Sequence, residues 1–287
     1  MNEGRTMVQH KRIRWRDVVS VNLMRLALIA ACLLTIFPLL WVATSSFNIG
    51  TSLYSSTLIP RKVTLMHYVN LFKKTSFAIW LKNSAIACIG GSLLALSLTV
   101  TMAYAFSRFR FWGRRYGLLV LILIQMLPSA AIIVAIFRIL QALRLLNTFL
   151  GLILVYGGTT IPFNAWLMRV YFDSIPRQLE ESAYIDGATH WQAFVRIAMP
   201  LAMPMVAVTF MFNLITFYND YILASIVLTG KQNYTVALGL RFFQAPYAAN
   251  WSLFAAASIL GSIPIALIFY SLQRFLVEGL TKGALKG

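Results

Sequence analysis

The sequence predicts an all-α membrane protein with six transmembrane helices. Of its 287 residues, 59% are hydrophobic and only 11% are charged, whereas a soluble domain carries about 25% charged residues. Such a chain has too little polar surface to cover a core in water, but it suits a lipid bilayer. About 20 apolar helical residues span the hydrocarbon layer. Six apolar runs reach that length, near residues 23–43, 82–106, 117–140, 149–171, 202–227 and 253–276.

The segments between these runs predict the orientation of the chain. Lysine and arginine are enriched in cytoplasmic loops of membrane proteins. Here lysines and arginines are more numerous on one side of the membrane, which holds the N-terminus 1–22, the loops 107–116 and 173–200, and the tail 278–287. The other side holds the loops 44–81 and 228–252 and has fewer of them. We therefore expect a transmembrane domain over residues 23–277, with a basic N-terminus and a short C-terminal tail both in the cytoplasm.

Composition and motifs argue against several functions. The net charge of +17 comes from short basic runs at the ends of apolar segments, which is not the pattern of a nucleic-acid surface. The cysteines and histidines fit no metal-ligand spacing, and no set of catalytic side chains is evident. A phosphate-binding loop is missing, because Gly230-Lys231 is followed by Gln232 and no glycine lies at the required earlier position. We therefore expect no enzymatic activity, no metal and no bound cofactor in this chain.

The loop 173–200 is the most informative polar segment. Glu180 and Glu181 suit the start of a short helix, and Gly187 allows a sharp turn. Thr189 and Gln192 form the pattern of a capping box, which predicts a second short helix. The apolar residues of that helix would let the loop dock into a groove on a soluble protein. The alternative is a solvated loop that only carries acidic residues.

The residue spacing in this loop resembles the coupling loop of ABC-importer permeases, whose pattern is E-A-A, three residues, G, nine residues, I-x-L-P. Ser182 and Met199 depart from that pattern. The segments 103–111, 147–156 and 279–287 further resemble sugar permeases, and the last resembles the end of the smaller permease of maltose-type systems. The resemblance assigns ATPase coupling to Glu181, Ser182, Ala183, Asp186, Gly187, Ile197 and Pro200.

The resemblance implies a type I importer permease in a bacterial cytoplasmic membrane. Its expected partners are a second homologous permease, two ATP-binding subunits that hold ATP and magnesium, an extracytoplasmic sugar-binding protein, and membrane lipid. The second permease can be identical or different, and a different one is favoured. The implied cargo is a sugar, with maltose or maltodextrin first and trehalose or another sugar next. A permease for another solute is a further alternative. A secondary transporter is less favoured, because such proteins usually carry more ionisable groups within their spans.

Polar residues inside the predicted spans are candidates for a translocation pathway. Asp220 is costly to place in a bilayer unless it faces a cavity or a partner, or sits at the water interface. Asn219 adjoins it, and Gln125 and Asn213 lie within other spans. The alternative for these residues is hydrogen bonding that joins helices. The pairs Gly90-Gly91 and Gly157-Gly158 predict close helix packing rather than hinges.

Overall fold

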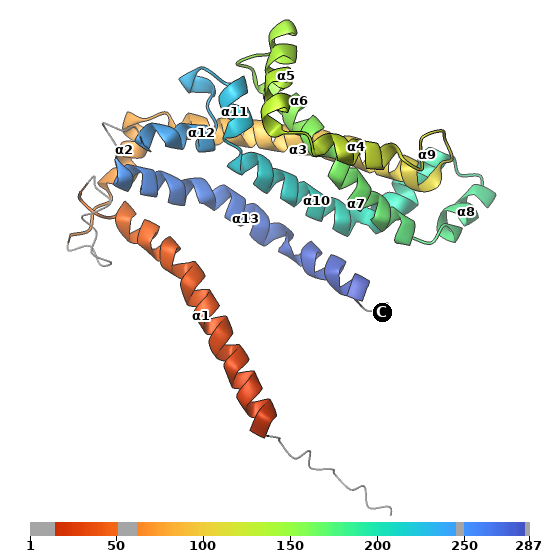
Figure 1. Cartoon of the computed structure of the whole chain (residues 1–287), viewed down its shortest axis with the longest axis horizontal. Coiled ribbons are helices and arrows are strands. Elements are labelled where there is room, and N and C mark those ends of the chain that lie inside the picture. Colours follow the sequence, from red (N-terminus) through yellow and green to blue (C-terminus); the bar gives the residue numbers. More distant parts are fainter. Residues whose placement is uncertain (1–14, 51–61, 245–249, 285–287) are drawn as a thin grey trace, which may run out of the picture.

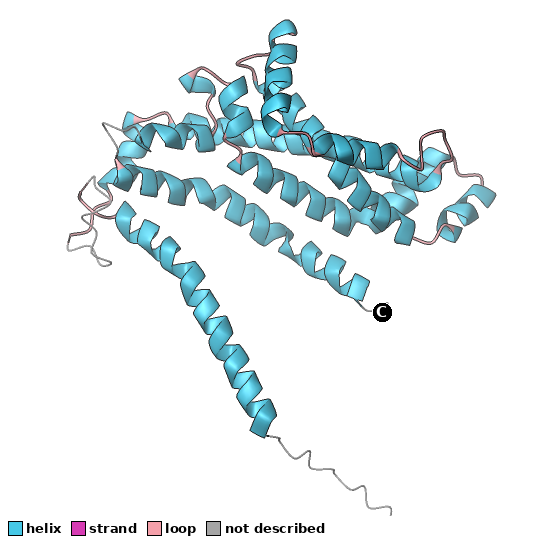
Figure 2. Ribbon diagram, in the orientation of Figure 1, coloured by secondary structure: helices cyan, strands magenta, loops and turns pink. Residues whose placement is uncertain are grey.

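The protein is described here by a computed structural model that covers residues 15–50, 62–244 and 250–284. Helices make up nearly all of this part of the chain, and its one β-bridge joins Asn48 to Val63 (Figures 1 and 2). The all-helical prediction is confirmed. The α-helices are α1 (Trp15–Ser46), α2 (Met66–Lys74), α3 (Phe77–Arg108), α4 (Gly117–Gln125), α5 (Ser129–Ala142), α6 (Phe149–Thr159), α7 (Ile161–Ser174), α8 (Gln178–Ile185), α9 (His190–Ala193), α10 (Met199–Asn219), α11 (Ile222–Val227), α12 (Val236–Leu240) and α13 (Trp251–Ala284).

Within the described residues, four helical segments are long and apolar enough to cross a membrane, and there are five if a bent pair of helices counts as one span. The four are Val19–Ser46, Phe77–Arg108, His190–Asn219 and Trp251–Phe275. The bent pair joins α6 to α7 at an angle of 49°. Pro162 stands in the first turn of α7, where its missing N–H does least harm to the new helix.

The third predicted span, 117–140, does not form one continuous helix. It is divided into α4 and α5, which are separated by residues 126–128. Pro128 has extended backbone angles, φ −54° and ψ 125°. Proline lacks the N–H for the helical ladder and disfavours helical angles at the residue before it, so the helix ends here. In Figure 1, α5 points away from the long helices.

The fifth predicted span also has different limits. Its helical run starts at His190, within the expected loop, and ends at Asn219 rather than at residue 227. Asp220 has extended angles, and the short helix α11 follows it. At the other end of the chain, α13 continues through the expected tail to Ala284, and residues 285–287 lie outside the described part.

The core lies where α3, α6 and α10 meet. Tyr156 of α6 is fully buried and stacks on Phe217 of α10, with the ring centroids 4.5 Å apart and the planes nearly parallel. Small residues on α3, such as Ala87 and Ala95, allow this close packing and are themselves buried. The three helices therefore form the packed centre of the molecule.

The glycine pairs behave partly as predicted. A methyl group on Gly91 would lie 2.8 Å from Cβ of Tyr156, and one on Gly157 would lie 2.6 Å from Cδ2 of Leu94. Both positions therefore set the approach of α3 and α6. Gly158 differs, because no atom lies within 4 Å of the place where its Cβ would stand.

This difference gives a matched test of helix packing. We expect Gly157→Ala to destabilise the protein by about 1–3 kcal/mol, because it overpacks the contact with Leu94. Gly158→Ala should be neutral or slightly stabilising, because alanine is the better helix former and has open space. Thermal unfolding of the purified protein in mild detergent measures both. Equal Tm shifts for the two variants would contradict this account.

The first helix stands apart from the rest. α1 packs against α13 near one end and then diverges from the bundle (Figure 1). None of the apolar window within Val19–Ser46 is buried. A helix that is apolar on all sides must be covered by lipid or by another protein. At the opposite end from this contact, the C-terminal end of α3 lies beside α8 and α9 (Figure 1).

Candidate functional site

The loop 173–200 folds as two short helices about a glycine, as the sequence predicts. We call α8, the turn at Gly187 and α9 the elbow. Gly187 has a φ of +87°, a conformation that favours glycine. The predicted capping box is present in full: Thr189 accepts from the backbone N–H of Gln192, and the Gln192 side chain accepts from the N–H of Thr189.

The second arm of the elbow is continuous with a membrane span. After α9 the chain makes a π-helical turn, Phe194–Ala198, in which the N–H of Met199 reaches the carbonyl of Phe194. Ile197 lies inside this turn, and Pro200 stands in the first turn of α10. Because no loop intervenes, a movement of α9 is carried directly into α10.

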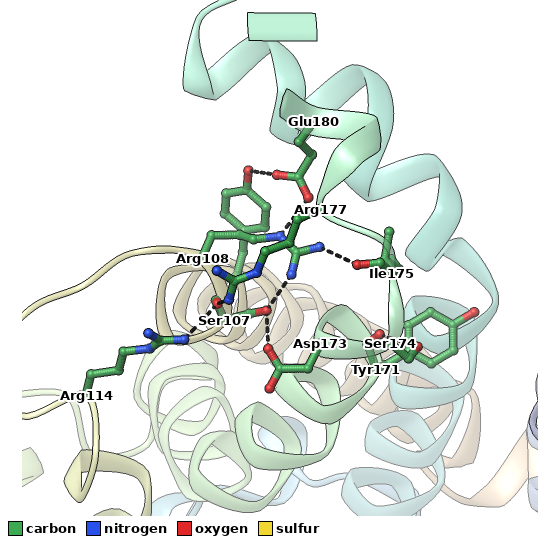
Figure 3. Close-up of polar contacts among 10 residues, drawn as sticks. Ser107, Arg108, Arg114, Tyr171, Asp173, Ser174, Ile175, Arg177 and Glu180 are labelled. Atoms are coloured by element: carbon green, nitrogen blue, oxygen red, sulfur yellow. Dashed lines mark hydrogen bonds and ion pairs between the residues drawn. The ribbon is translucent and has the colours of Figure 1, made fainter. Parts of the chain in front are cut away.

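The first arm is fixed to the end of α3 by a buried carboxylate. Glu180 accepts from the Arg108 guanidinium at 2.7 Å and from the Tyr104 hydroxyl at 2.5 Å. The two charged side chains are only 8% and 3% exposed. Arg108 also donates to the carbonyl of Ile175, just before α8 (Figure 3). Sequence reasoning placed Glu180 in the first turn of a helix but missed this pairing, since nothing along the chain links α3 to α8.

Two further arginines complete the end of α3. The last carbonyls of a helix have no partner within the helix. Arg114 donates to the carbonyls of Phe106 and Ser107, and Arg177 donates to that of Ser107 at 2.7 Å (Figure 3). The Ser107 hydroxyl in turn donates to Asp173 at the end of α7. The positive charge of Arg114 and Arg177 also complements the negative end of the α3 dipole. The elbow, α3 and α7 are thus joined at one polar node.

The outer face of the elbow combines acidic and large apolar side chains. Glu181, Ser182 and Asp186 are exposed. Ile185 is 88% exposed and Trp191 is 66% exposed. Exposed apolar side chains beside carboxylates suit contact with another protein. Ala183 is half-buried, so the residues of the predicted motif differ in their exposure to solvent.

Two cavities hold most of the predicted pathway residues. The larger, about 800 Å³, is lined by Asp220, Gln125 and Thr159 among others, and the smaller, about 420 Å³, by Asn213, Gln125 and Thr159 among others. Gln125 donates to the carbonyl of Thr159 at 2.6 Å. The breaks in the two divided helical pairs, α4–α5 and α6–α7, therefore meet where the two cavities adjoin.

The remaining candidates at the end of α10 have structural contacts. Both carboxylate oxygens of Asp220 are engaged: they accept from the Tyr156 hydroxyl and from the backbone N–H groups of Leu223 and Ala224. These bonds begin α11 and favour the structural alternative for Asp220, although it also lines the larger cavity. Asn219 is exposed, donates to the carbonyl of Ile215, and lines neither of these cavities.

Fold and site together define a polytopic helical membrane protein with a rigid elbow at one end of its bundle. Comparison with known proteins then gives the family. Residues 95–282 match the family described as "Binding-protein-dependent transport system inner membrane component". The chain belongs to this family, so it is a multi-pass protein of the cytoplasmic membrane, and the resemblance to ABC-importer permeases is confirmed.

Several curated proteins are similar over most of their length. The galactooligosaccharides transport system permease of Bacillus subtilis (strain 168) is 42% identical, over 88% of this chain and 90% of that protein. A maltodextrin transport system permease of Streptococcus pneumoniae is 37% identical, over 96% and 99%. A solved bacterial ABC transporter for the import of alginate shares the fold, with a TM-score of 0.79, 22% identity and coverage of 91% and 98%.

Proposed function

We propose that this chain is one permease subunit of an ATP-driven sugar importer. It belongs to a family of transport components, and its relatives of 34–42% identity are permeases for oligosaccharides. Maltodextrin relatives make maltose or maltodextrin the first candidate cargo. The galactooligosaccharide relative makes a galactooligosaccharide the second candidate cargo, which is also a neutral sugar.

The elbow is the observation that carries this proposal. Its acidic and apolar outer face suits docking into a soluble subunit, and its rear is tied to α3 through Glu180 and continues into α10. ATP binding with magnesium on two partner subunits would bring those subunits together. Glu181 and Asp186 would pair with them, and the rigid elbow would convert their approach into rocking of α3 and α10.

The same proposal places the chain in a larger assembly. Six spans with both termini in the cytoplasm would put the elbow on the ATPase side, with the divided pair α4–α5 serving as one broken span. The exposed faces of α1 would be covered by lipid and by a second, homologous permease. An extracytoplasmic sugar-binding protein would deliver cargo at the far end. A solved relative in fold was crystallised with such a periplasmic protein.

Cross-linking tests the position of the ATPase. In a cysteine-free background, Ile185→Cys should cross-link to the ATP-binding subunit, because Ile185 projects from the outer face of the elbow. Ile222→Cys is the matched control, since this residue is also an exposed isoleucine but lies in α11, past the far end of α10. A product from Ile222 alone, or none from either site in an intact complex, would overturn the proposal.

A further inference from the structure

A basic and aromatic turn joins α3 to α4 at the same end of the bundle as the elbow (Figure 1). Residues 109–116, which we call the basic turn, have the sequence Phe-Arg-Phe-Trp-Gly-Arg-Arg-Tyr and include no acidic residue. Arg110 and Arg115 are exposed, and neither pairs with a carboxylate in the part of the chain that the structure describes. Trp112 is 100% exposed. The turn therefore presents unpaired positive charge beside a large, uncovered indole ring.

The contacts of the basic turn with α3 fix its conformation. Arg114 donates to the carbonyls of Phe106 and Ser107 (Figure 3). The ring of Phe111 packs edge-on against that of Phe106, with the ring centroids 4.9 Å apart. Gly113 has a φ of +90°, which allows the chain to reverse its direction. The turn is thus held in one shape against the end of α3.

The length of α3 places the basic turn among the lipid headgroups. α3 has 32 residues, and a helix of this size is about 48 Å long. The hydrocarbon layer is about 30 Å thick, and the bilayer with its headgroups about 40–45 Å. Both ends of α3 therefore reach the headgroup layer. After the turn, α4 exposes apolar side chains such as Leu119, Val120 and Leu123, which suit the hydrocarbon layer. A turn this short between two such helices stays at the membrane surface.

We propose that the basic turn binds the headgroups of anionic phospholipids. The inference uses only the membrane location of the chain and does not depend on its cargo. Guanidinium groups donate to phosphate oxygens, and the two cations favour anionic over zwitterionic lipid. Trp112 would lie at the level of the headgroups, which suits an indole ring with its apolar body and polar N–H. The Arg115 guanidinium lies 5.2 Å from the centroid of the Tyr116 ring, which holds its charge near the same layer.

A soluble subunit is the alternative occupant, and charge argues against it. The outer face of the elbow carries the exposed acids Glu181 and Asp186. A subunit that docks on these acids would present positive charge, which would repel Arg110 and Arg115. An anionic lipid surface has the opposite charge and attracts them. Lipid bound at the basic turn would hold the end of α3, and with it the polar node behind the elbow, at the membrane surface.

Quenching of Trp112 fluorescence by brominated lipids tests this proposal. The purified full chain is reconstituted in phosphatidylcholine vesicles that contain the same small fraction of either brominated phosphatidylglycerol or brominated phosphatidylcholine. The difference between the wild type and Trp112→Phe isolates the signal of Trp112 from those of the other tryptophans. We expect the anionic lipid to quench this signal at least about threefold more strongly. The preference should weaken at high salt, because exposed charges are screened.

Matched charge variants show whether the two arginines cause the preference, each variant being measured with and without Trp112→Phe. Arg110→Gln with Arg115→Gln should make the two lipids quench equally. Arg138→Gln with Arg144→Gln removes the same charge from exposed arginines of α5 and the turn after it, and should keep the preference.

Four results would overturn the proposal: no quenching of Trp112 by either lipid, equal quenching by both in the wild type, a preference that survives the loss of Arg110 and Arg115, or one that the control pair also abolishes. Loss of co-purifying ATP-binding subunits from the Arg110 and Arg115 variant, with its lipid preference unchanged, would assign the turn to a protein partner instead.

Discussion

Glu180→Leu is expected to destabilise the protein by about 3–5 kcal/mol, the usual cost of leaving one charge of a buried pair without its partner. Arg108 would remain only 8% exposed, and the Tyr104 hydroxyl would lose its acceptor. The elbow would also lose its tie to α3. We expect a lower Tm in detergent and a loss of the ATPase stimulation that sugar-loaded binding protein produces.

A double-mutant cycle shows whether the pair is responsible. Replacing both charged groups with apolar ones removes the uncompensated charge, so Arg108→Met with Glu180→Leu should be more stable than either single variant. The rescue should be incomplete, because the Tyr104 hydroxyl stays unpaired. Additive losses of Tm would mean that the ion pair is not what holds the elbow.

The neighbouring acid supplies the control. Glu181 follows Glu180 in α8 but is exposed, and exposed substitutions usually change stability by less than about 0.5 kcal/mol. Glu181→Leu should therefore keep Tm while weakening attachment of the ATPase subunits. The two adjacent glutamates would thus have different roles: Glu180 positions the elbow, and Glu181 contacts the partner.

The contrast between these residues also explains how far the sequence alone could go. The helical class, the turn at Gly187 and the capping box of Thr189 and Gln192 depend on patterns within a few residues, which local chemistry determines. The pairing of Arg108 with Glu180 joins segments 72 residues apart. No local pattern encodes such a contact, so the inner face of the elbow could not be predicted.

The span limits failed for a related reason. Hydropathy measures only the length of an apolar run. The predicted third span therefore continued past Pro128, and the predicted fifth span continued past Asp220. Pro128 separates α4 from α5, and the carboxylate of Asp220 begins α11 by accepting hydrogen bonds from its backbone N–H groups. Both effects depend on backbone hydrogen bonds rather than on hydropathy. The pathway candidate Asn213 accepts a hydrogen bond from Asn164 of α7, and this contact likewise depends on the packing of α7 on α10.

Gly187→Val is expected to uncouple ATP hydrolysis from transport, with sugar uptake falling by 10-fold or more in reconstituted vesicles (about 1.4 kcal/mol or more at the coupling step). A φ of +87° is strained for any residue with a Cβ and most of all for a β-branched one. The elbow would relax by changing the angle between α8 and α9. Uptake and ATPase rates are measured together, so that lost coupling is distinguished from lost assembly.

Gly113 provides a control of matched backbone geometry. It has a φ of +90°, and like Gly187 it has no atom within 4 Å of the place for a Cβ. Gly113→Val should cost a similar amount of stability, roughly 1–2 kcal/mol, yet keep uptake, since it lies between α3 and α4 rather than in the elbow. Gly187→Asn should be milder than Gly187→Val, because asparagine tolerates positive φ. Equal loss of uptake from Gly113→Val and Gly187→Val would mean that general instability, and not the angle of the elbow, governs transport.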